Sequence, residues 1–164
     1  MASAIYPGSF DPITRGHLDI LQRFQKVFDK VYVAVGNSTK KKYLFDFDER
    51  ANLVREVTKD LVNIEVIAFD GLTVDCARDV GAEFILRGVR TAGDFEYEQR
   101  MASMNYRLNP KIDTILVYSK PELNIISSSL IKEVALMGGD IHQFVPEIVA
   151  SELQKKLANK ITKK

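Results

Sequence analysis

The sequence predicts an α/β fold in which a doubly wound sheet of five parallel strands carries helices on both faces, within one domain spanning residues 1–164. Short apolar runs rich in β-branched residues alternate with amphipathic stretches of helical period. The runs are apolar almost throughout, as strands buried on both faces are. A chain of 164 residues can fill one core, and no Pro-, Gly- or Ser-rich linker divides it.

The first half of the chain contains three predicted strands separated by two predicted helices. The strands are Ala2–Tyr6, Val31–Gly36 and Ile64–Ala68. The first helix begins near Gly16, and its apolar face is formed by Leu18, Leu21, Phe24 and Phe28. The second helix has an N-cap at Asp46 or Asp48, and its apolar face is formed by Ala51, Val54, Val57 and Leu61.

The second half contains two further predicted strands, Phe84–Arg87 and Thr114–Tyr118, and three helices. One helix ends at Asn109-Pro110, because the residue before a proline disfavours helical geometry. Its apolar face is formed by Tyr97, Met101, Met104 and Leu108. The next helix follows Ser127 and ends at Gly138-Gly139. The last, Pro146–Lys160, is amphipathic with a Lys-rich end that complements the helix dipole.

This alternation is typical of a Rossmann-like fold, in which ligands bind beyond the carboxyl ends of the strands. A net charge of +1 indicates no nucleic-acid surface and no membrane-binding face. The chain shows neither a signal peptide nor an apolar run of the roughly 18 residues that a membrane helix needs. Cys76, the one cysteine, is expected to be a small core residue. We therefore expect a cytoplasmic protein with no nucleic-acid or membrane partner.

The loop after the first strand carries the clearest signal for a ligand site. Gly8 lets the backbone leave the strand sharply, and Ser9 offers a hydroxyl and an amide. Gly16 leaves space beside a helix N-terminus, where free amides and the helix dipole favour anions. His17 lies in the first helical turn, where its ring is able to donate to a phosphoryl oxygen. The alternative is that His17 only caps or packs the helix.

The sequence of this loop resembles the first motif of the nucleotidylyltransferase superfamily. It reads Tyr-Pro-Gly-Ser-Phe-Asp-Pro-Ile-Thr-x-Gly-His. Thr14 and His17 take the first and last places of its (H/T)xGH signature. The full wording is similar to the bacterial-type phosphopantetheine adenylyltransferase family. The resemblance implies transfer of the adenylyl group of ATP to 4'-phosphopantetheine, giving dephospho-coenzyme A and pyrophosphate. It also implies that Ser9, Phe10 and His17 contact the substrates.

Two arginines follow the fourth strand, and their spacing suits phosphate binding. Arg87 and Arg90 are separated only by Gly88-Val89 and are each able to bind a phosphate in bidentate fashion. Salt bridges to Asp94, Glu96 or Glu98 are the alternative interpretation. The resemblance implies that Arg87 contacts the phosphate of phosphopantetheine, and that the nucleotide is contacted by Gly88, Val89, Arg90 and Glu98.

Two other loops gain a role only through the resemblance. Lys40-Lys41-Lys42 reads by itself as a solvated charge run. The resemblance assigns the attacking phosphate to Lys41, with its two neighbours as one-position alternatives. It also implies that Leu72 and Thr73 line the pantetheine arm, although a turn followed by an N-cap Thr73 explains this segment equally well.

Three serines, Ser127, Ser128 and Ser129, precede the fifth predicted helix, where serines are normally N-caps. The resemblance adds a second nucleotide motif, so that ATP would be bound by Leu123, Asn124, Ile125, Ile126, Ser127, Ser128 and Ser129. Family members often carry an aromatic residue where this chain has Leu123, which leaves no ring for stacking there. The helix-capping and anion-binding interpretations use the same free amides and are compatible.

The implied reaction is a direct in-line attack that needs no enzyme nucleophile. Its expected catalytic residues are His17, Lys41 and Arg90. Mg²⁺ is expected with ATP, held by phosphates and water rather than by protein ligands. The resemblance also implies a homohexamer and feedback binding of coenzyme A.

Three other classes of function compete with this interpretation: a sibling nucleotidylyltransferase, a nucleotide-binding module and a nucleic-acid-binding protein. A cytidylyltransferase or a nicotinate-mononucleotide adenylyltransferase shares the first motif, but the Arg87–Arg90 loop favours the phosphopantetheine family. A non-catalytic nucleotide-binding module has no need for the full set of residues. A nucleic-acid-binding role is disfavoured because no basic stripe interleaved with aromatic residues is present.

Overall fold

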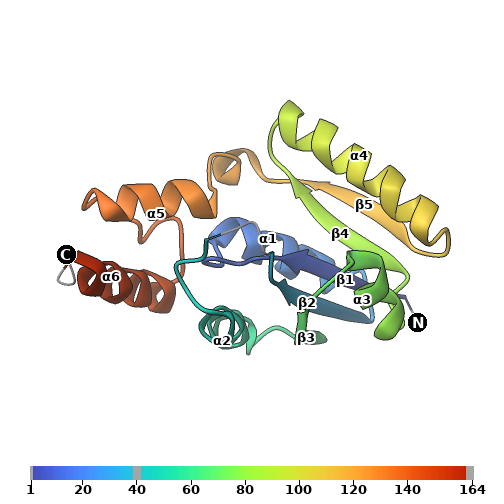
Figure 1. Cartoon of the computed structure of the whole chain (residues 1–164), viewed down its shortest axis with the longest axis horizontal. Coiled ribbons are helices and arrows are strands. Elements are labelled where there is room, and N and C mark those ends of the chain that lie inside the picture. Colours follow the sequence, from blue (N-terminus) through green and yellow to red (C-terminus); the bar gives the residue numbers. More distant parts are fainter. Residues whose placement is uncertain (1, 39–41, 162–164) are drawn as a thin grey trace.

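A single five-stranded sheet forms the centre of the computed structural model, which describes residues 2–38 and 42–161 (Figure 1). All neighbouring strands pair in parallel, in the order β3-β2-β1-β4-β5. The predicted parallel sheet is confirmed, and no strand boundary differs from its prediction by more than two residues. The strands are β1 (Ser3–Gly8), β2 (Lys30–Gly36), β3 (Ile64–Phe69), β4 (Phe84–Val89) and β5 (Asp113–Tyr118).

The predicted helices are all found, together with one α-helix that the sequence analysis missed. The missed helix, α3, has seven residues and begins after Leu72, which makes no capping hydrogen bond. Thr73 is therefore the first helical residue and not the N-cap. The helices are α1 (Arg15–Phe24), α2 (Phe47–Thr58), α3 (Thr73–Asp79), α4 (Ala92–Leu108), the 3-10 helix η1 (Pro121–Leu123), α5 (Ser128–Leu136) and α6 (Glu147–Ile161).

Two of these helices end earlier than the apolar pattern predicted. α1 ends at Phe24 and α2 at Thr58, so Phe28 and Leu61 lie beyond them. Phe28 is buried and Leu61 is partly buried against the same core. Phe28 and Leu61 therefore belong to the loops that follow these helices, and their spacing only happens to match the helical period.

The helix boundaries that depend on capping residues were predicted correctly. At the start of α2, the Asp46 side chain accepts a hydrogen bond from the Glu49 amide at 2.9 Å, and Glu49 accepts one from the Asp46 amide at 2.8 Å. Ser127 caps α5 by accepting from the Leu130 amide at 3.1 Å. Gly138, just past the end of α5, has a φ of 81°, which favours glycine.

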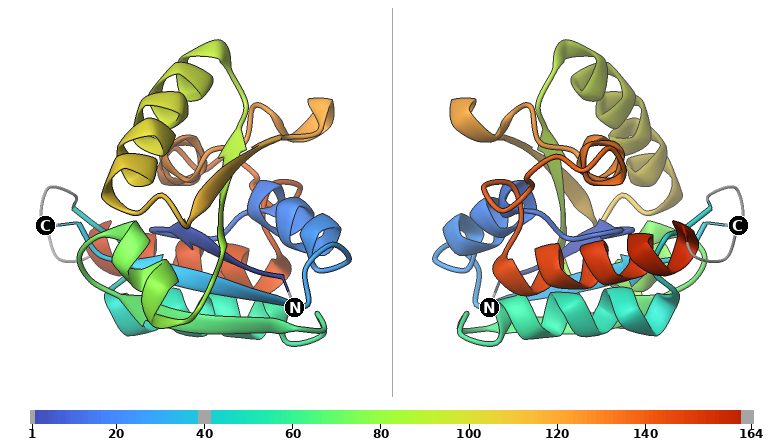
Figure 2. Two further views of the ribbon diagram at one scale, coloured as in Figure 1. Left: turned by 90° about the vertical axis from the view of Figure 1, so that its right-hand side faces the viewer. Right: turned by 90° about the vertical axis from the view of Figure 1, so that its left-hand side faces the viewer.

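Alternation of side chains along the strands divides the core into two layers. Ala4 and Tyr6 point into the larger layer, which is covered by α1, α2, α5 and α6. Ile5 points into the smaller layer, which is covered by α3. Figure 2 shows α1 and α4 on opposite sides of the sheet. Cys76 lies on α3 and is buried, as predicted.

The central strands β1 and β4 part before they reach their carboxyl ends. They pair only through Ala4 with Phe84 and Ile5 with Ile85, whereas β1 pairs with β2 along all six of its residues. Chain connections run in opposite directions on either side of this point, which is the switch point of the sheet. The fold therefore opens a space between β1 and β4 at the edge where the strand-following loops gather.

One predicted apolar face is exposed. On α4, the exposed fraction is 60% for Tyr97, 54% for Met104 and 52% for Leu108. The apolar face predicted for this helix, Tyr97 included, is therefore not packed against the core of the single chain. An adjacent side of α4 buries two polar residues, Glu98 and Asn105.

No helix among residues 2–38 and 42–161 combines the length and the apolar character needed to cross a membrane.

Helix α6 is expected to be an integral part of the core. Leu153 on α6 has no exposed surface. We predict that Leu153→Ala lowers the free energy of unfolding by about 2–5 kcal/mol, because it leaves a cavity in a packed interior. Urea denaturation followed by circular dichroism measures this change. The exposed neighbour Gln154→Ala should change stability by less than about 0.5 kcal/mol, and equal effects of both variants would contradict the role of α6.

Candidate functional site

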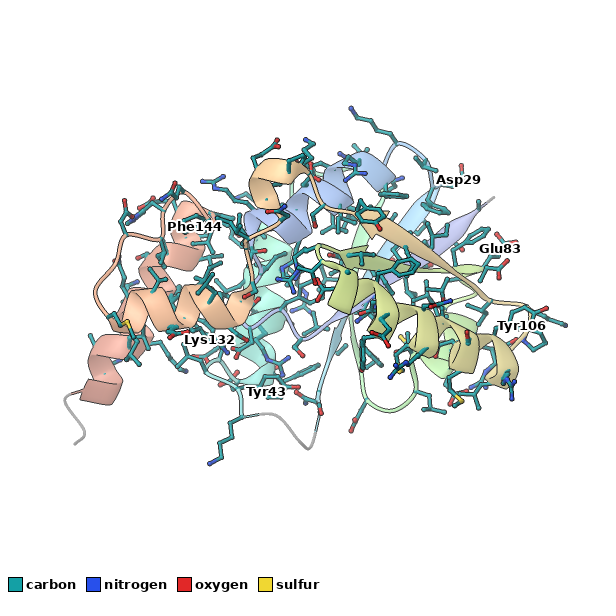
Figure 3. All side chains as sticks on the ribbon, turned by 90° about the horizontal axis from the view of Figure 1, so that it is seen from above. Asp29, Tyr43, Glu83, Tyr106, Lys132 and Phe144 are labelled. Carbon is teal, nitrogen blue, oxygen red and sulfur yellow. The ribbon has the colours of Figure 1, made fainter. Side chains whose placement is uncertain are left out.

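A cavity of about 520 Å³ lies at the carboxyl edge of the sheet, over the gap between β1 and β4. Its walls come from the loops that follow β1, β2, β4 and β5 and from the N-termini of α1 and α5. Tyr43 and Lys132, labelled in Figure 3, both line it, one from the loop after β2 and the other from α5. Two helix N-termini therefore face one cavity, which favours an anionic ligand.

His17 is held in place by a capping box at the start of α1. Its own amide donates to the Thr14 hydroxyl at 3.3 Å, and its Nδ1 lies 3.1 Å from the Thr14 amide nitrogen. His17 lines the cavity. The capping role and the predicted ligand-facing position are thus combined in one side chain, since they use different nitrogens of the ring.

The same capping box fixes the protonation state of His17. An amide N–H can only donate, so Nδ1 must accept with its lone pair and the ring proton must lie on Nε2. Burial, followed by the positive charges of Arg90 and Arg87, lowers the pKa of His17 from 6.5 to about 4. At neutral pH the ring is therefore uncharged, with Nε2–H as a hydrogen-bond donor.

Aromatic rings pack around this histidine. The Phe10 ring centroid lies 5.1 Å from that of His17 and 5.7 Å from that of Tyr6, and both pairs meet edge to face. A side chain at Gly8 would place its Cβ 3.0 Å from the Phe10 ring, so any other residue there would force that ring to shift. Burial raises the pKa of Tyr6, which keeps its hydroxyl protonated. The wall beside His17 is therefore rigid and uncharged.

Arg87 bridges the gap between the two central strands. Its Nη1 donates to the Pro7 carbonyl of β1 at 2.9 Å, and its Nε and Nη2 each donate to the Glu98 carboxylate at 2.7 Å. The alternative of a salt bridge between Arg87 and Glu98 is thus confirmed. Glu98 is nearly buried, so it holds the guanidinium in a defined orientation at the cavity wall.

Arg90 connects the loop after β4 with the loop after β5. Its Nε lies 3.1 Å from Asp94, and its Nη1 donates to the Ile126 carbonyl at 2.9 Å. Ile126 directly precedes the three serines at the N-terminus of α5, all of which line the cavity. Arg90 therefore fixes the position of the serine segment relative to the sheet.

Asp11 and Lys132 are site residues that the sequence analysis missed. The buried Asp11 carboxylate accepts from the amides of Leu44 and Phe45 at 3.0 and 2.9 Å and lies 2.7 Å from Lys132 Nζ. The Ser128 hydroxyl donates to the Pro12 carbonyl at 2.7 Å. Asp11 lies within the first motif, and that position was the only sequence signal for it. Its partners could not be read from the sequence, because Lys132 lies 121 residues away.

Most of the residues predicted for the site line this cavity. They are Ser9, Phe10, His17, Arg87, Gly88, Arg90, Glu98, Leu123, Ile126, Ser127, Ser128 and Ser129. A side chain at Gly88 would require the Ile20 side chain to move, because a Cβ there would lie 2.8 Å from Ile20 Cδ1.

Six predicted residues are not brought to the cavity by the described structure. Val89 is fully buried, because its side chain continues the packed part of β4. Ile125 and Leu72 are exposed, and neither Asn124 nor Thr73 lines the cavity. Lys41 lies outside the described residues, although its neighbour Lys42 is a lining residue.

The charges of the cavity are nearly balanced among the residues described. Two lysines and two arginines line it together with three carboxylates, Asp11, Asp94 and Glu98. Each carboxylate already contacts a lysine or an arginine. In the part of the chain that is described, no group of three or more His, Cys, Asp or Glu side chains is placed to hold a metal ion.

Comparison with known proteins gives consistent results for sequence and fold. A family model described as cytidylyltransferase-like matches residues 5–134. A phosphopantetheine adenylyltransferase from Caldanaerobacter subterraneus subsp. tengcongensis is 50% identical over 156 residues, covering 95% of this chain and 98% of that protein. One from Syntrophomonas wolfei is 48% identical over 159 residues, covering 97% and 99% respectively.

A solved structure supports the fold at lower sequence similarity. The Plasmodium falciparum nicotinic acid mononucleotide adenylyltransferase complexed with NaAD superposes with a TM-score of 0.66 and 15% identity, covering 97% of this chain and 95% of that one. At this identity the likeness is one of fold alone.

The two histidines are expected to titrate on opposite sides of pH 6.5. The pKa of His17 is about 4, whereas the hydrogen bond that His142 donates to the Asp140 carboxylate raises the pKa of His142. NMR titration of the imidazole ¹⁵N resonances measures both, and at pH 7 the His17 pattern should show a proton on Nε2 only. His142→Gln serves as the control that assigns the signals.

The low pKa of His17 has a consequence for stability. The unfolded chain binds a proton at this residue near pH 6.5 and the folded chain only near pH 4, so the free energy of unfolding falls as the pH drops through this window. His17→Gln should remove this part of the acid sensitivity in urea denaturation. A His17 signal that titrates at or above 6.5 would contradict the buried, neutral ring.

Proposed function

The chain belongs to the phosphopantetheine adenylyltransferase family, and from this premise we propose that it transfers the adenylyl group of ATP to 4'-phosphopantetheine, giving dephospho-coenzyme A and pyrophosphate. The observation that carries the proposal is the match to these relatives over almost the whole chain. The cavity at the switch point of the sheet, lined by residues at the N-termini of two helices, supports it independently.

The proposed reaction is a single displacement at phosphorus. A phosphate oxygen of 4'-phosphopantetheine forms a bond to the α-phosphorus of ATP, while the bond from that phosphorus to the α,β-bridging oxygen breaks and pyrophosphate leaves. The attacking oxygen is already anionic at neutral pH, so no general base is required. The protein contributes by positioning two polyanions and by stabilising the charge of the transition state.

His17 is assigned to the α-phosphoryl group. Its Nε2–H is a donor whose orientation is fixed through Nδ1 by the capping box. A neutral donor can bind a phosphoryl oxygen without protonating it, and the low pKa keeps the ring neutral beside two arginines. No proton is transferred, so the contribution is electrostatic.

The acceptor phosphate is assigned to Arg87, Ser9 and Lys41. Arg87 reaches the cavity wall between β1 and β4, beside the loop that carries Ser9. Glu98 is proposed to orient Arg87 rather than to contact the nucleotide directly, because both carboxylate oxygens bind the guanidinium. Leu72 and Thr73, at the start of α3, remain proposed contacts of the pantetheine arm outside the cavity.

The nucleotide is assigned to the opposite wall. Arg90 and the N-terminus of α5 with Ser127, Ser128 and Ser129 supply donors for the departing pyrophosphate. Gly88 and the Phe10 amide allow close approach of the ligand. The segment from Leu123 to Ile126 is proposed to bind through its backbone, since the Ile125 side chain points to solvent.

Mg²⁺ is proposed to accompany ATP. The three lining carboxylates contact cations of the protein, so phosphate oxygens and water are the ligands that suit the ion here. When bound, it would neutralise charge on the phosphates.

Within the same proposal, the protein acts in the cytoplasm. Coenzyme A is proposed to bind in the cavity as a feedback ligand, because it shares the pantetheine and adenylate parts of the product.

The proposed function is tested by pyrophosphate release from ATP with and without 4'-phosphopantetheine. Release that depends on the acceptor, with an equal amount of dephospho-coenzyme A, is the expected result. Release only with nicotinate mononucleotide or another acceptor, or only from CTP, would instead identify a sibling nucleotidylyltransferase.

We predict that His17→Ala lowers turnover by about 10²–10³-fold, because it removes a transition-state donor. ATP affinity, measured by calorimetry, should change little, since the phosphates keep their other donors. His142→Ala, which removes the other histidine of the chain, should leave turnover unchanged. Near-normal turnover of His17→Ala would remove His17 from the mechanism.

The exposed face of α4 supports the proposal of a homohexamer. Tyr97, Met101, Met104 and Leu108 recur with helical period on one side of α4 and are all exposed in the single chain. A contiguous exposed apolar surface of this kind commonly marks a protein–protein interface. We assign this face to contact between copies of the chain.

Met104→Glu is expected to weaken this assembly by about tenfold or more, because it places a charge in the centre of an apolar contact. Light scattering coupled to size-exclusion chromatography measures the mass across a dilution series. Val62→Glu is the matched control, since Val62 is 72% exposed in the loop before β3. An unchanged mass for Met104→Glu would contradict the assignment of this face.

A further inference from the structure

Arg50 is a fully buried arginine that does not line the cavity, yet its guanidinium holds two of the loops that form it. Its Nη1 donates to the Ser9 carbonyl at 2.7 Å and to the Gly36 carbonyl at 2.8 Å. Its Nη2 donates to the Asn37 side chain. One side chain on α2 thus ties the loop after β1 to the loop after β2.

The surroundings of Arg50 are unusual for a buried cation. None of the carboxylates in the described structure forms an ion pair with it, and its buried Nε lacks a hydrogen-bond partner there. Its charge is instead surrounded by carbonyl dipoles and by two rings, with Cζ lying 4.1 Å from the Tyr43 centroid and 5.5 Å from the Phe47 centroid. A buried cation without a carboxylate is costly, so a stabilising role alone explains it poorly.

The bond to Ser9 determines the direction of the next amide. The Ser9–Phe10 peptide is trans, so its C=O and N–H point in opposite directions. With the carbonyl held by Arg50, the Phe10 N–H points away from Arg50, and Phe10 is one of the residues that line the cavity. The Phe10 amide makes no hydrogen bond to another described residue, and Phe10 has a φ of 49°, a conformation that a non-glycine residue rarely adopts.

We propose that Arg50 is a positioning residue for the reaction, which aims the free Phe10 amide at a nucleotide phosphate by holding the Ser9 carbonyl from behind. The bonds to Gly36 and Asn37 brace the guanidinium from the loop after β2, and Tyr43 covers it. Arg50 itself does not contact the substrate. This proposal rests on the proposed function for the identity of the anion, for which ATP and pyrophosphate are the probes.

The test observes the Phe10 amide directly. The chain contains nine phenylalanines, so protein labelled with ¹⁵N-phenylalanine gives nine amide signals, and Phe10→Leu identifies the relevant one. On titration with ATP and Mg²⁺, the Phe10 signal of the natural chain should shift strongly. Arg50→Lys keeps the charge but cannot hold both loops, so this shift should be largely lost and the Kd for ATP should rise about tenfold.

Two further variants make the result decisive. Arg55→Lys alters an exposed arginine further along α2, whose guanidinium donates a hydrogen bond to the Asn52 side chain, and should behave as the natural chain. Asn37→Ala removes one exposed brace and should raise the Kd about threefold with a reduced Phe10 shift. If Arg50→Lys fails to fold, as judged by loss of the nine signals, Asn37→Ala decides the question.

The possible outcomes separate this proposal from the proposed function. An unchanged Phe10 shift and a Kd within about twofold in the folded Arg50→Lys protein, or in Asn37→Ala where the former does not fold, overturns the role of Arg50 alone. A general response of all nine signals in Arg50→Lys would show a structural role only and also overturns it. A natural chain that responds to neither ATP nor pyrophosphate contradicts both proposals.

Discussion

The separation of β1 from β4 is the constraint on which the site depends. Two paired positions hold these strands together, and beyond Ile5 and Ile85 the ladder stops. Backbone groups that would pair in a continuous sheet need other partners, and Arg87 supplies one by donating to the Pro7 carbonyl. The side chain that fills the gap is thus also the one that presents positive charge at the cavity wall. The shape of the cavity and the positive charge at its wall therefore both follow from the separation of β1 and β4.

Polar side chains around the cavity are held by neighbours before any ligand arrives. Glu98 orients Arg87, Asp94 and the Ile126 carbonyl orient Arg90, and a capping box orients His17. Such preorganisation means that little conformational freedom is lost when charge develops during reaction. It also explains why a net charge of only +1 is compatible with phosphate binding. A few hydrogen-bond donors that are held in fixed orientations can bind a phosphate without a large excess of positive charge.

The sequence predicted the parts of the fold and site that depend on local patterns. Apolar runs located all five strands, and capping residues such as Asp46 and Ser127 located helix starts. The first motif placed His17 at the cavity, but not the tautomer of its ring, which depends on a hydrogen bond to Thr14. Arg50 and Asp11 were missed because their roles arise from contacts with distant loops. The exposure of Tyr97 was also unpredictable, since a helical stripe looks the same whether a sheet or a second chain covers it.

Contacts across the cavity join the N-terminal and C-terminal parts of the chain. Asp11 and Pro12 are joined to Lys132 and Ser128 across the site, over sequence separations of 121 and 116 residues. A ligand that spans these walls adds a noncovalent cross-link between the first and last thirds of the chain. It binds only the folded form and therefore stabilises it by an amount that grows with the logarithm of the ligand concentration above the Kd. The free energy of unfolding of this chain is in this way coupled to the concentration of any ligand that bridges these walls.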